Sequence, residues 1–327
     1  MSLLEVEDLT VTFAQKGERP FTAVDKVSFT VEPGQTVGLV GESGCGKSVT
    51  SLAIMGLLPK RGNTVSGSVR FAGTELLSLS DKQLRDRRGS DLAMVFQDPL
   101  TSLNPVVTIG LQVAEVLERH EGLKRKAALA RAAELLDQVG IPDPHRRVGE
   151  YPHQLSGGMR QRALIAIALA CQPKLLIADE PTTALDVTIQ AQILALLRQL
   201  VAGTDTALIM ITHDLGVVAG LCDEVNVLYA GRVVERGERH ELFAAPRHPY
   251  TNGLLASIPR LDAPRGERLH PITGSVGDNI PWSGGCAFAP RCSNAIEVCT
   301  ETAPDLIDTE GRLLRCHNPV ALVKGES

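Results

Sequence analysis

A glycine-rich run near the N-terminus carries the residue types that bind phosphate. Residues 41–48 read GESGCGKS and follow a short apolar run at 36–40. Glycines allow backbone N–H groups to turn toward phosphate oxygens, and a helix that begins after them presents the positive end of its dipole. In this pattern Lys47 holds the β- and γ-phosphates and Ser48 ligates Mg²⁺. The run predicts a nucleoside triphosphate site that comprises Gly41, Ser43, Gly44, Cys45, Gly46, Lys47, Ser48 and Val49.

Two carboxylates end a second apolar run. Residues 174–180 read KLLIADE, so Asp179 and Glu180 stand where a strand is expected to end. Ligands of parallel α/β sheets bind at the carboxyl ends of the strands. Asp179 is therefore suited to assist Mg²⁺, and Glu180 is suited to orient or deprotonate an attacking water. An apolar run that ends in Asp-Glu is by itself as often just a strand that leaves the core. In a chain that also contains GESGCGKS, it predicts a hydrolytic centre.

The elements that position these residues follow from hydrophobic periodicity. Apolar runs predict strands at residues 4–13, 27–31, 36–40, 174–178, 207–212 and 225–229. Helical spacing predicts helices at residues 127–139, 160–171 and 187–201, and the whole stretch from about 99 to 170 has helical character. Strands that alternate with helices predict an α/β fold with a mainly parallel sheet.

Composition excludes several classes of protein. The 327 residues suffice for one large domain with an extension, or for two domains. A hydrophobic content of 43% argues against disorder along the whole chain, and a net charge of −5 argues against a nucleic-acid backbone as the main partner. No run approaches the roughly 18 apolar residues of a membrane span, and the acidic N-terminus does not resemble a secretory signal. We therefore expect a cytosolic chain, which is compatible with a position against a membrane.

The string LSGGM at residues 155–159 precedes the helical segment 160–171 and resembles the signature of the ATP-binding-cassette (ABC) family. In that family the signature completes the ATP site of a second subunit, so two cassettes enclose two nucleotides. The resemblance thus implies contacts to a partner's ATP from Ser156, Gly157, Gly158 and Gln161. Met159 stands where many members carry Gln. The backbone N–H groups of a Ser-Gly-Gly helix start form an anion site whichever residue follows.

Four further positions match family motifs in the expected order. The strings FQDP at 96–99, PTTALD at 181–186 and ITHD at 211–214 resemble the Q-loop, the D-loop and the switch histidine. By this resemblance Gln97 contacts Mg²⁺ or water, Asp186 belongs to the D-loop and His213 touches the γ-phosphate. Phe13, at the end of the first expected strand, matches the aromatic residue that stacks on adenine.

The resemblance implies an ABC-type nucleotide-binding domain over residues 1–258. Such a domain combines a P-loop parallel-sheet core, an antiparallel β subdomain and an α-helical subdomain, here at about 99–170. Residues 259–327 are expected to form a C-terminal extension. Because one cassette without a membrane span cannot transport alone, the family implies a second ABC ATPase subunit and two transmembrane permease subunits.

Three longer strings narrow the resemblance to the dipeptide/oligopeptide importers. They are FQDPLTSLNP at 96–105, YPHQLSGGMRQR at 151–162 and RHPYT at 247–251. The resemblance implies an ATPase motor for peptide uptake at the cytoplasmic face of the cell membrane, with a paralogue as the second ATPase and a solute-binding protein as an indirect partner. Nickel, glutathione or another small solute remains an alternative cargo, and a soluble ABC ATPase without a transport role is a further alternative.

Four of the seven cysteines lie in this C-terminal extension, residues 259–327, which we also call the tail. They are Cys286, Cys292, Cys299 and Cys316. Their spacing lacks the tight Cys pairs of most zinc sites, whereas iron–sulfur clusters tolerate varied spacing. Arg291 and Arg315 each precede a cysteine, and a nearby positive charge favours the ligating thiolate. The subfamily also implies a [4Fe–4S] cluster here. We expect that cluster on the four cysteines in a structural role, with Zn²⁺ or reduced cysteines as alternatives.

Overall fold

The computed structural model describes residues 2–14, 20–183, 185–202, 204–258, 272–276, 284–309 and 311–321. The chain folds as two compact units. Unit 1 consists of Met1–Leu3, Val31–Thr36 and Glu75–Ile211, and unit 2 consists of Leu4–Thr30, Val37–Thr74 and Thr212–Ser327. Each unit is therefore assembled from segments that lie far apart in the sequence.

The strands of unit 1 form a parallel sheet segment. Its order is β8-β7-β6, with β6 at Leu92–Val95, β7 at Leu175–Asp179 and β8 at Ala207–Thr212. Both neighbouring pairs are parallel. Every residue of β7 and β8 is buried, as expected for uninterrupted apolar runs in a parallel sheet. This arrangement confirms the strands predicted at 174–178 and 207–212.

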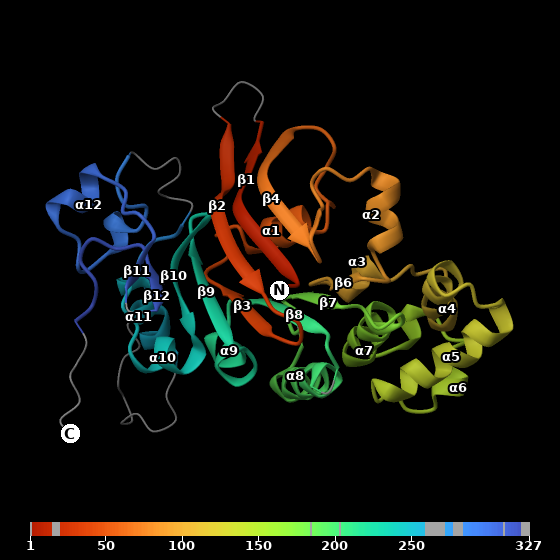
Figure 1. Cartoon of the computed structure of the whole chain (residues 1–327). Helices are drawn as coiled ribbons and strands as arrows, with labels where there is room; N and C mark the ends of the chain where they lie inside the picture. The colour runs from red at the N-terminus through yellow and green to blue at the C-terminus, as the bar shows by residue number, and fades with distance from the viewer. Residues whose placement is uncertain are drawn as a thin grey trace. The chain divides into compact units, whose positions relative to one another are not determined.

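Helices dominate the rest of unit 1, and Figure 1 shows them in colours from orange through yellow to green. They are α2 (Asp81–Arg87), α3 (Pro99–Ser102), α4 (Ile109–His120), α5 (Arg125–Gln138), α6 (Pro144–Arg147), the 3₁₀ turn η1 (Pro152–Gln154), α7 (Gly157–Leu169) and α8 (Val187–Val201). Helices α4, α5 and α7 contact one another. The buried faces of α4 and α5 include Val113, Leu117, Ala132 and Leu136, all fully buried. Helices of this length are marginally stable in isolation, so the packing of these apolar faces against one another stabilises them.

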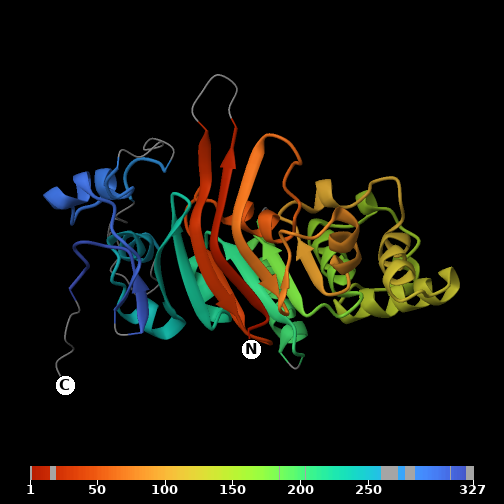
Figure 2. The ribbon, with the colours of Figure 1, turned by 45° about the horizontal axis from the view of Figure 1, so that its top comes forward.

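Unit 2 contains an antiparallel layer from the N-terminal part of the chain, drawn in red and orange in Figure 2. The strand order is β2-β1-β4, with β1 at Leu4–Phe13, β2 at Phe21–Val31 and β4 at Asn63–Phe71. Strands β1 and β4 pair antiparallel with a register shift between Glu7 and Thr10. The short strand β5 (Thr74–Glu75) follows β4.

A second sheet of unit 2 joins residues from both ends of the chain. Its order is β11-β12-β10-β9-β3, with β3 at Thr36–Val40, β9 at Glu224–Tyr229, β10 at Arg232–Glu238, β11 at Ile307–Thr309 and β12 at Arg312–Leu314. Strands β3 and β9 are parallel, whereas the pairs β9–β10, β10–β12 and β11–β12 are antiparallel. The tail thus extends the sheet that carries β3.

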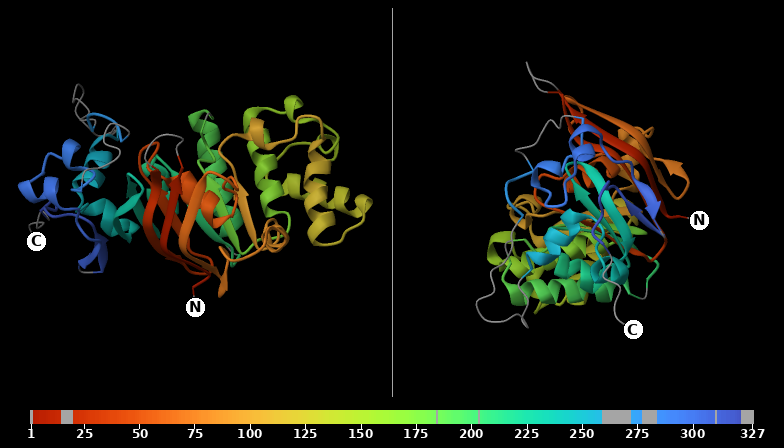
Figure 3. Two further views of the ribbon diagram at one scale, coloured as in Figure 1. Left: turned by 90° about the horizontal axis from the view of Figure 1, so that it is seen from above. Right: turned by 90° about the vertical axis from the view of Figure 1, so that its left-hand side faces the viewer.

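The helices of unit 2 are short. They are α1 (Lys47–Ile54), α9 (Leu215–Leu221), α10 (Arg239–Ala244), α11 (Pro249–Ala256), the 3₁₀ turn η3 (Ala289–Arg291) and α12 (Glu297–Glu301). Figure 3 shows the blue tail beside the teal α10 and α11. No helix in the described ranges has the length and apolar character needed to cross a membrane.

Candidate functional site

The phosphate-binding loop of unit 2 begins where β3 ends and closes where α1 begins. Gly41 has φ +153° and Gly46 has φ +97°, and both approach backbone so closely that a side chain would not fit. A Cβ atom on Gly41 would lie 2.2 Å from the carbonyl oxygen of Leu228, and one on Gly46 would lie 2.4 Å from that of Ala23. The packing of the loop therefore requires glycine at positions 41 and 46.

The mouth of this loop has the features of an anion cradle. Gly46 is the N-cap of α1 and supplies no side-chain hydrogen bond to the helix start, so the first N–H groups of α1 can serve phosphate oxygens. A Cβ on Gly44 would meet nothing within 4 Å, so this part of the loop is open. The residues present therefore fit a bound phosphate chain, and Ser48 at the second position of α1 suits the predicted Mg²⁺ ligation.

Lys47 lies along the loop with its side chain held by carbonyl groups. It is 4% exposed, and its Nζ donates to the carbonyl oxygens of Gly41 at 2.7 Å and Glu42 at 2.9 Å. These acceptors fix the ammonium group at the loop. The Sγ atom of Cys45 lies 3.7 Å from the same Nζ, and burial raises the pKa of this thiol, so Cys45 acts here as a small packed side chain.

The two carboxylates that were expected to take part in hydrolysis lie in unit 1 at the end of β7. Asp179 is the last residue of the strand and is 5% exposed, and Glu180 follows it with φ +45°. A non-glycine residue in this left-handed region costs roughly 1–3 kcal/mol and is often found at functional sites. The strain is held by backbone hydrogen bonds from the Glu180 N–H to Ile211 at 2.8 Å and from the Thr183 N–H to Glu180 at 3.1 Å.

Two side chains orient the Glu180 carboxylate. The amide Nε2 of Gln97 and the hydroxyl of Thr183 each donate to its Oε2 atom at 2.9 Å. The structure therefore brings Gln97 and Glu180 together, although 83 residues separate them in the chain. Sequence reasoning did not single out Thr183, but its place three residues after Glu180 in the PTTALD string is a signal that could have found it.

The signature segment begins helix α7. Ser156 is the N-cap, and its hydroxyl accepts a hydrogen bond of 3.3 Å from the N–H of Met159. A Cβ on Gly158 would lie 2.8 Å from Cγ2 of Ile189 in α8, whereas a Cβ on Gly157 would make an ordinary contact at 3.6 Å. Gly158 is thus needed for the close approach of two helices. Gln161 is 1% exposed and lies within the unit, and its Nε2 has no partner among the described residues.

The remaining expected residues occupy loop and strand ends. Asp186 is the exposed N-cap of α8 and accepts a hydrogen bond of 3.0 Å from the N–H of Ile189. His213 is exposed directly after β8, and Phe13 ends β1 with its side chain partly exposed. Unit 1 carries Gln97, Asp179, Glu180, Asp186 and the signature, whereas unit 2 carries the phosphate-binding loop, Phe13 and His213.

Comparison with known proteins identifies the family. Residues 24–183 match the ABC transporter family model, and residues 234–299 match the model of the C-terminal region of oligopeptide/dipeptide transporters. The dipeptide transport ATP-binding protein DppD of Haemophilus influenzae is 50% identical over 98% of this chain and 96% of its own length. The chain belongs to the ATP-binding subunits of dipeptide and oligopeptide ABC transporters. It is therefore an ABC ATPase.

Other relatives show how far the resemblance extends. The oligopeptide transport protein OppD of Salmonella typhimurium is also 50% identical, over 97% of this chain and 94% of its own length. The dipeptide and oligopeptide relatives thus match this ABC ATPase equally well. A solved ABC cassette, a dimer in a post-hydrolysis state with ADP and Pi, has a TM-score of 0.64 at 30% identity and covers 72% of this chain and 98% of its own. This likeness confirms the ABC nucleotide-binding fold.

The predicted [4Fe–4S] cluster on Cys286, Cys292, Cys299 and Cys316 is wrong. The four cysteines line one small pocket, and all are free. However, no group of three or more His, Cys, Asp or Glu side chains within the described parts of this ABC ATPase is placed to hold a metal ion. The same finding removes the Zn²⁺ alternative. The relatives are, by name, ATP-binding proteins.

The physical reason lies in the thiols and in their neighbouring arginines. Burial raises the pKa of the Cys286 and Cys292 thiols and raises that of Cys316 to about 11, so the ligating thiolate is disfavoured. Arg291 was expected to favour thiolate at Cys292, but its guanidinium pairs with Glu42. Arg315 donates instead to the carbonyl oxygens of Val233 and Pro304, at 3.0 Å each.

Hydrogen bonds and side-chain packing hold the tail without a metal. The N–H of Cys286 donates to the carbonyl oxygen of Cys299 at 2.7 Å, and β12 pairs with β10 through Leu314 and Glu235. Phe288 and Cys299 are 3% and 6% exposed. The buried residues of this small core come from several short elements, so they form no periodic pattern in the proline-rich sequence of the tail.

Proposed function

We propose that this ABC ATPase is the motor of an importer that couples ATP binding and hydrolysis to the uptake of dipeptides or oligopeptides across the cytoplasmic membrane. The observation that carries the proposal is the match at 50% identity along nearly the whole chain to proteins named for dipeptide and for oligopeptide transport. The match to the C-terminal region of such transporters supports the same solute class.

The chemistry assigned to individual residues follows their positions in the fold. Bound Mg²⁺ supplies positive charge that stabilises the phosphates, with Ser48, Gln97 and Asp179 as its proposed ligands. Lys47 and the N–H groups of residues 41–49 bind the β- and γ-phosphates. Phe13 stacks on adenine, and His213 contacts the γ-phosphate.

Glu180 is the proposed general base. Its carboxylate orients and deprotonates the water that attacks the γ-phosphorus. The two hydrogen bonds at 2.9 Å from Gln97 and Thr183 support this role, because they hold one carboxylate oxygen in a single orientation. As the water oxygen bonds to the γ-phosphorus, the bond between that phosphorus and the β–γ bridging oxygen breaks, so ADP and inorganic phosphate are the products. The proton taken up by Glu180 then passes to solvent.

The proposed assembly contains a second ABC ATPase, which we infer to be a paralogue. In it, Ser156, Gly157 and Gly158 contact ATP bound by the partner, and Asp186 lies at the contact of the two subunits. Gln161, which was expected to make such a contact, is 1% exposed and is therefore not part of this surface. The dimeric state of the solved cassette with ADP and Pi supports a dimer. Two transmembrane permease subunits and, indirectly, a solute-binding protein complete the importer, so the chain acts at the cytoplasmic face of the membrane.

We also propose that residues 259–327 are a C-terminal extension of a cassette that spans residues 1–258. The position of β11 and β12 supports this proposal. These two strands from the extension are added to the sheet beyond β10, which belongs to the cassette. The four cysteines of the extension are free thiols.

Uptake by the assembled importer tests the proposed function. The chain is co-expressed with its candidate permeases, purified from membranes, and reconstituted with the binding protein for uptake assays over di- and oligopeptides, nickel and glutathione. ATP-dependent uptake of peptides is expected, and it is expected to cease with Glu180→Gln. Copurification without peptide uptake, or transport of nickel or glutathione instead, would contradict the proposed solute.

A further inference from the structure

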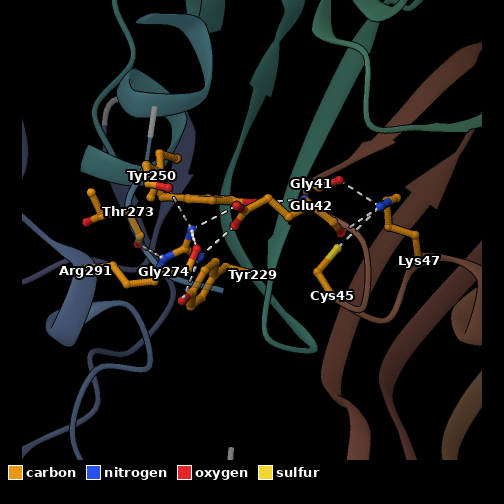
Figure 4. A network of polar contacts seen from close by, with 10 residues as sticks. Gly41, Glu42, Cys45, Lys47, Tyr229, Tyr250, Thr273, Gly274 and Arg291 are labelled. Carbon is orange, nitrogen blue, oxygen red and sulfur yellow. Dashed lines mark hydrogen bonds and ion pairs between the residues drawn. The ribbon is translucent and has the colours of Figure 1, made fainter. Parts of the chain in front are cut away.

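Glu42 occupies a position that the phosphate-binding motif leaves open, yet its three polar groups are all bound (Figure 4). Its N–H donates to the hydroxyl of Tyr250 at 2.9 Å, and its carbonyl oxygen accepts from Lys47 Nζ at 2.9 Å. Its carboxylate forms a two-point ion pair with Arg291, with Nη1–Oε2 at 2.7 Å and Nη2–Oε1 at 2.9 Å. Glu42 thus links Lys47 of the phosphate-binding loop to Arg291 of the C-terminal region.

Arg291 is held rigidly for this contact. Besides Glu42, its guanidinium donates to the carbonyl oxygens of Thr273 at 2.8 Å and Gly274 at 3.0 Å and to the hydroxyl of Tyr229 at 3.3 Å. These bonds use all five N–H donors of the side chain. The side chain is 3% exposed, whereas that of Glu42 is 30% exposed. Arg291 is therefore the fixed partner, and Glu42 is the partner that it positions.

An aromatic cluster fixes the elements around the pair. The rings of Tyr229 from β9, Tyr250 from α11 and Phe288 from the tail lie edge to face, with centroids 4.7–5.3 Å apart. All three side chains are at most 3% exposed. Phe288 stands just before η3, the turn that carries Arg291. Packing of the tail therefore determines where the guanidinium meets the loop.

We propose that Arg291 is a positioning residue for the nucleotide site, through which the C-terminal region holds the phosphate-binding loop in its ATP-binding conformation. This inference rests on the proposed function and adds a role for the tail in it. The carbonyl groups of Gly41 and Glu42 anchor the ammonium of Lys47, so a displacement of Glu42 displaces that anchor. Arg291 also neutralises the Glu42 carboxylate, whose negative charge would otherwise repel nucleotide phosphates.

The test compares Arg291→Gln with a matched tail variant in the full-length protein. Arg312 is also a largely buried tail arginine that pairs with the body of unit 2, through Glu241 at 3.2 Å and the carbonyl oxygen of Ala245 at 2.7 Å, and both of these partners lie outside the loop. Arg312→Gln is therefore the control. We measure the Kd for ATP with Mg²⁺, and the KM and kcat of hydrolysis by the assembled importer.

Arg291→Gln is expected to raise Kd and KM for ATP about tenfold while kcat at saturating ATP stays within about twofold. Arg312→Gln is expected to leave Kd within about twofold. Glu42→Gln/Arg291→Gln is expected to bind ATP more tightly than Arg291→Gln alone, because the double variant removes the unneutralised carboxylate. Such non-additivity would show that the two residues act as a pair.

Equal Kd values for the wild type and Arg291→Gln would overturn the inference, as would equal losses in the Arg291 and Arg312 variants. If Arg291→Gln does not fold, Arg291→Lys carries the test, because it keeps the charge but loses the two-point geometry. Its expected signature is a raised Kd with faster amide hydrogen exchange at residues 42–48. Unchanged exchange and Kd would refute the positioning role. Failure of the wild type to bind ATP would instead contradict the proposed function.

Discussion

The side-chain amide of Gln97 donates a hydrogen bond of 2.9 Å to the Glu180 carboxylate, alongside a second donor from Thr183. The amide of Gln97 and the hydroxyl of Thr183 orient the carboxylate, and the backbone of Glu180 is in the left-handed region with φ +45°. The proposed base is thus held by two hydrogen bonds to one carboxylate oxygen. This relationship links the Q-loop to the hydrolytic step in the proposed mechanism.

Replacement of the proposed base should separate binding from turnover. Glu180→Gln is expected to lower the rate of phosphate release at least about 100-fold, because the amide cannot accept the proton of the attacking water. The Kd for ATP should stay within a few-fold of wild type. Glu134→Gln, on the exposed face of α5, is the control and should keep both values. Near-normal hydrolysis by Glu180→Gln would show that another group is the base.

Removal of a donor to Glu180 should slow turnover through that residue. Thr183→Val keeps the shape of the side chain but loses the hydroxyl, and we expect kcat to fall about fivefold, which corresponds to a hydrogen bond of about 1 kcal/mol. Thr188→Val, at an exposed position of α8, is the matched control. In the Glu180→Gln background, Thr183→Val should have no further effect. An additive loss there would mean that Thr183 acts elsewhere.

Adjacent signature glycines should respond differently to alanine. Gly158→Ala places a methyl group 2.8 Å from Cγ2 of Ile189, so the free energy of unfolding should fall by about 1–3 kcal/mol. Gly157→Ala makes an ordinary contact at 3.6 Å and should leave stability equal or slightly higher, because alanine favours helix. Urea denaturation measures both. Ile189→Ala should relieve Gly158→Ala, and a fully additive double variant would contradict the steric reason.

A buried histidine should make the protein less stable in mild acid. Burial lowers the pKa of His248 to about 3, below the ordinary value near 6.5. Between these values the unfolded chain binds more protons, so the free energy of unfolding falls as pH decreases, by about 2 kcal/mol from pH 7 to pH 5. The carboxylate of the buried Glu235 accepts a hydrogen bond from the N–H of His248. Burial raises the pKa of Glu235, so the folded chain binds more protons at this group as pH decreases, which opposes the effect of His248.

The contribution of His248 is isolated by His248→Asn. Nδ1 of His248 accepts from the N–H of Tyr250 at 3.0 Å as the N-cap of α11, and asparagine can supply a comparable acceptor without titrating. Urea denaturation at pH 7 and pH 5 should show a loss about 2 kcal/mol smaller in the variant than in the wild type, since Glu235 is common to both. Equal losses would assign the acid sensitivity to other groups.

The functional motifs could be recognised without coordinates because each is a local string with a local physical cause. GESGCGKS predicts a loop between a buried strand and a helix, and the structure has β3 and α1 on either side of it. The strands at 4–13 and 207–212 and the helix at 187–201 have the predicted bounds. The strand β10 and the helix α11 were not predicted. Tyr250 of α11 packs against Phe288 of the tail, a contact that local periodicity does not reveal.

The cysteine prediction failed for a reason that spacing cannot reveal. Four thiols that line one pocket bind a metal only if they converge and lose their protons. Burial instead raises the pKa of the Cys286, Cys292 and Cys316 thiols. The guanidinium groups of Arg291 and Arg315 bind other acceptors. A residue that precedes a cysteine in sequence need not face its sulfur atom.

What the amino-acid sequence determined by itself is the chemistry that each short segment can perform: a loop for phosphates, a carboxylate at the end of a strand, a Ser-Gly-Gly helix start. Tertiary structure alone decided which distant side chains hold those groups. Glu42 and Arg291 are 249 residues apart, and nothing in either neighbourhood predicts their ion pair. Motifs depend on backbone conformation within a few residues, whereas the partners of a side chain depend on how the whole chain packs.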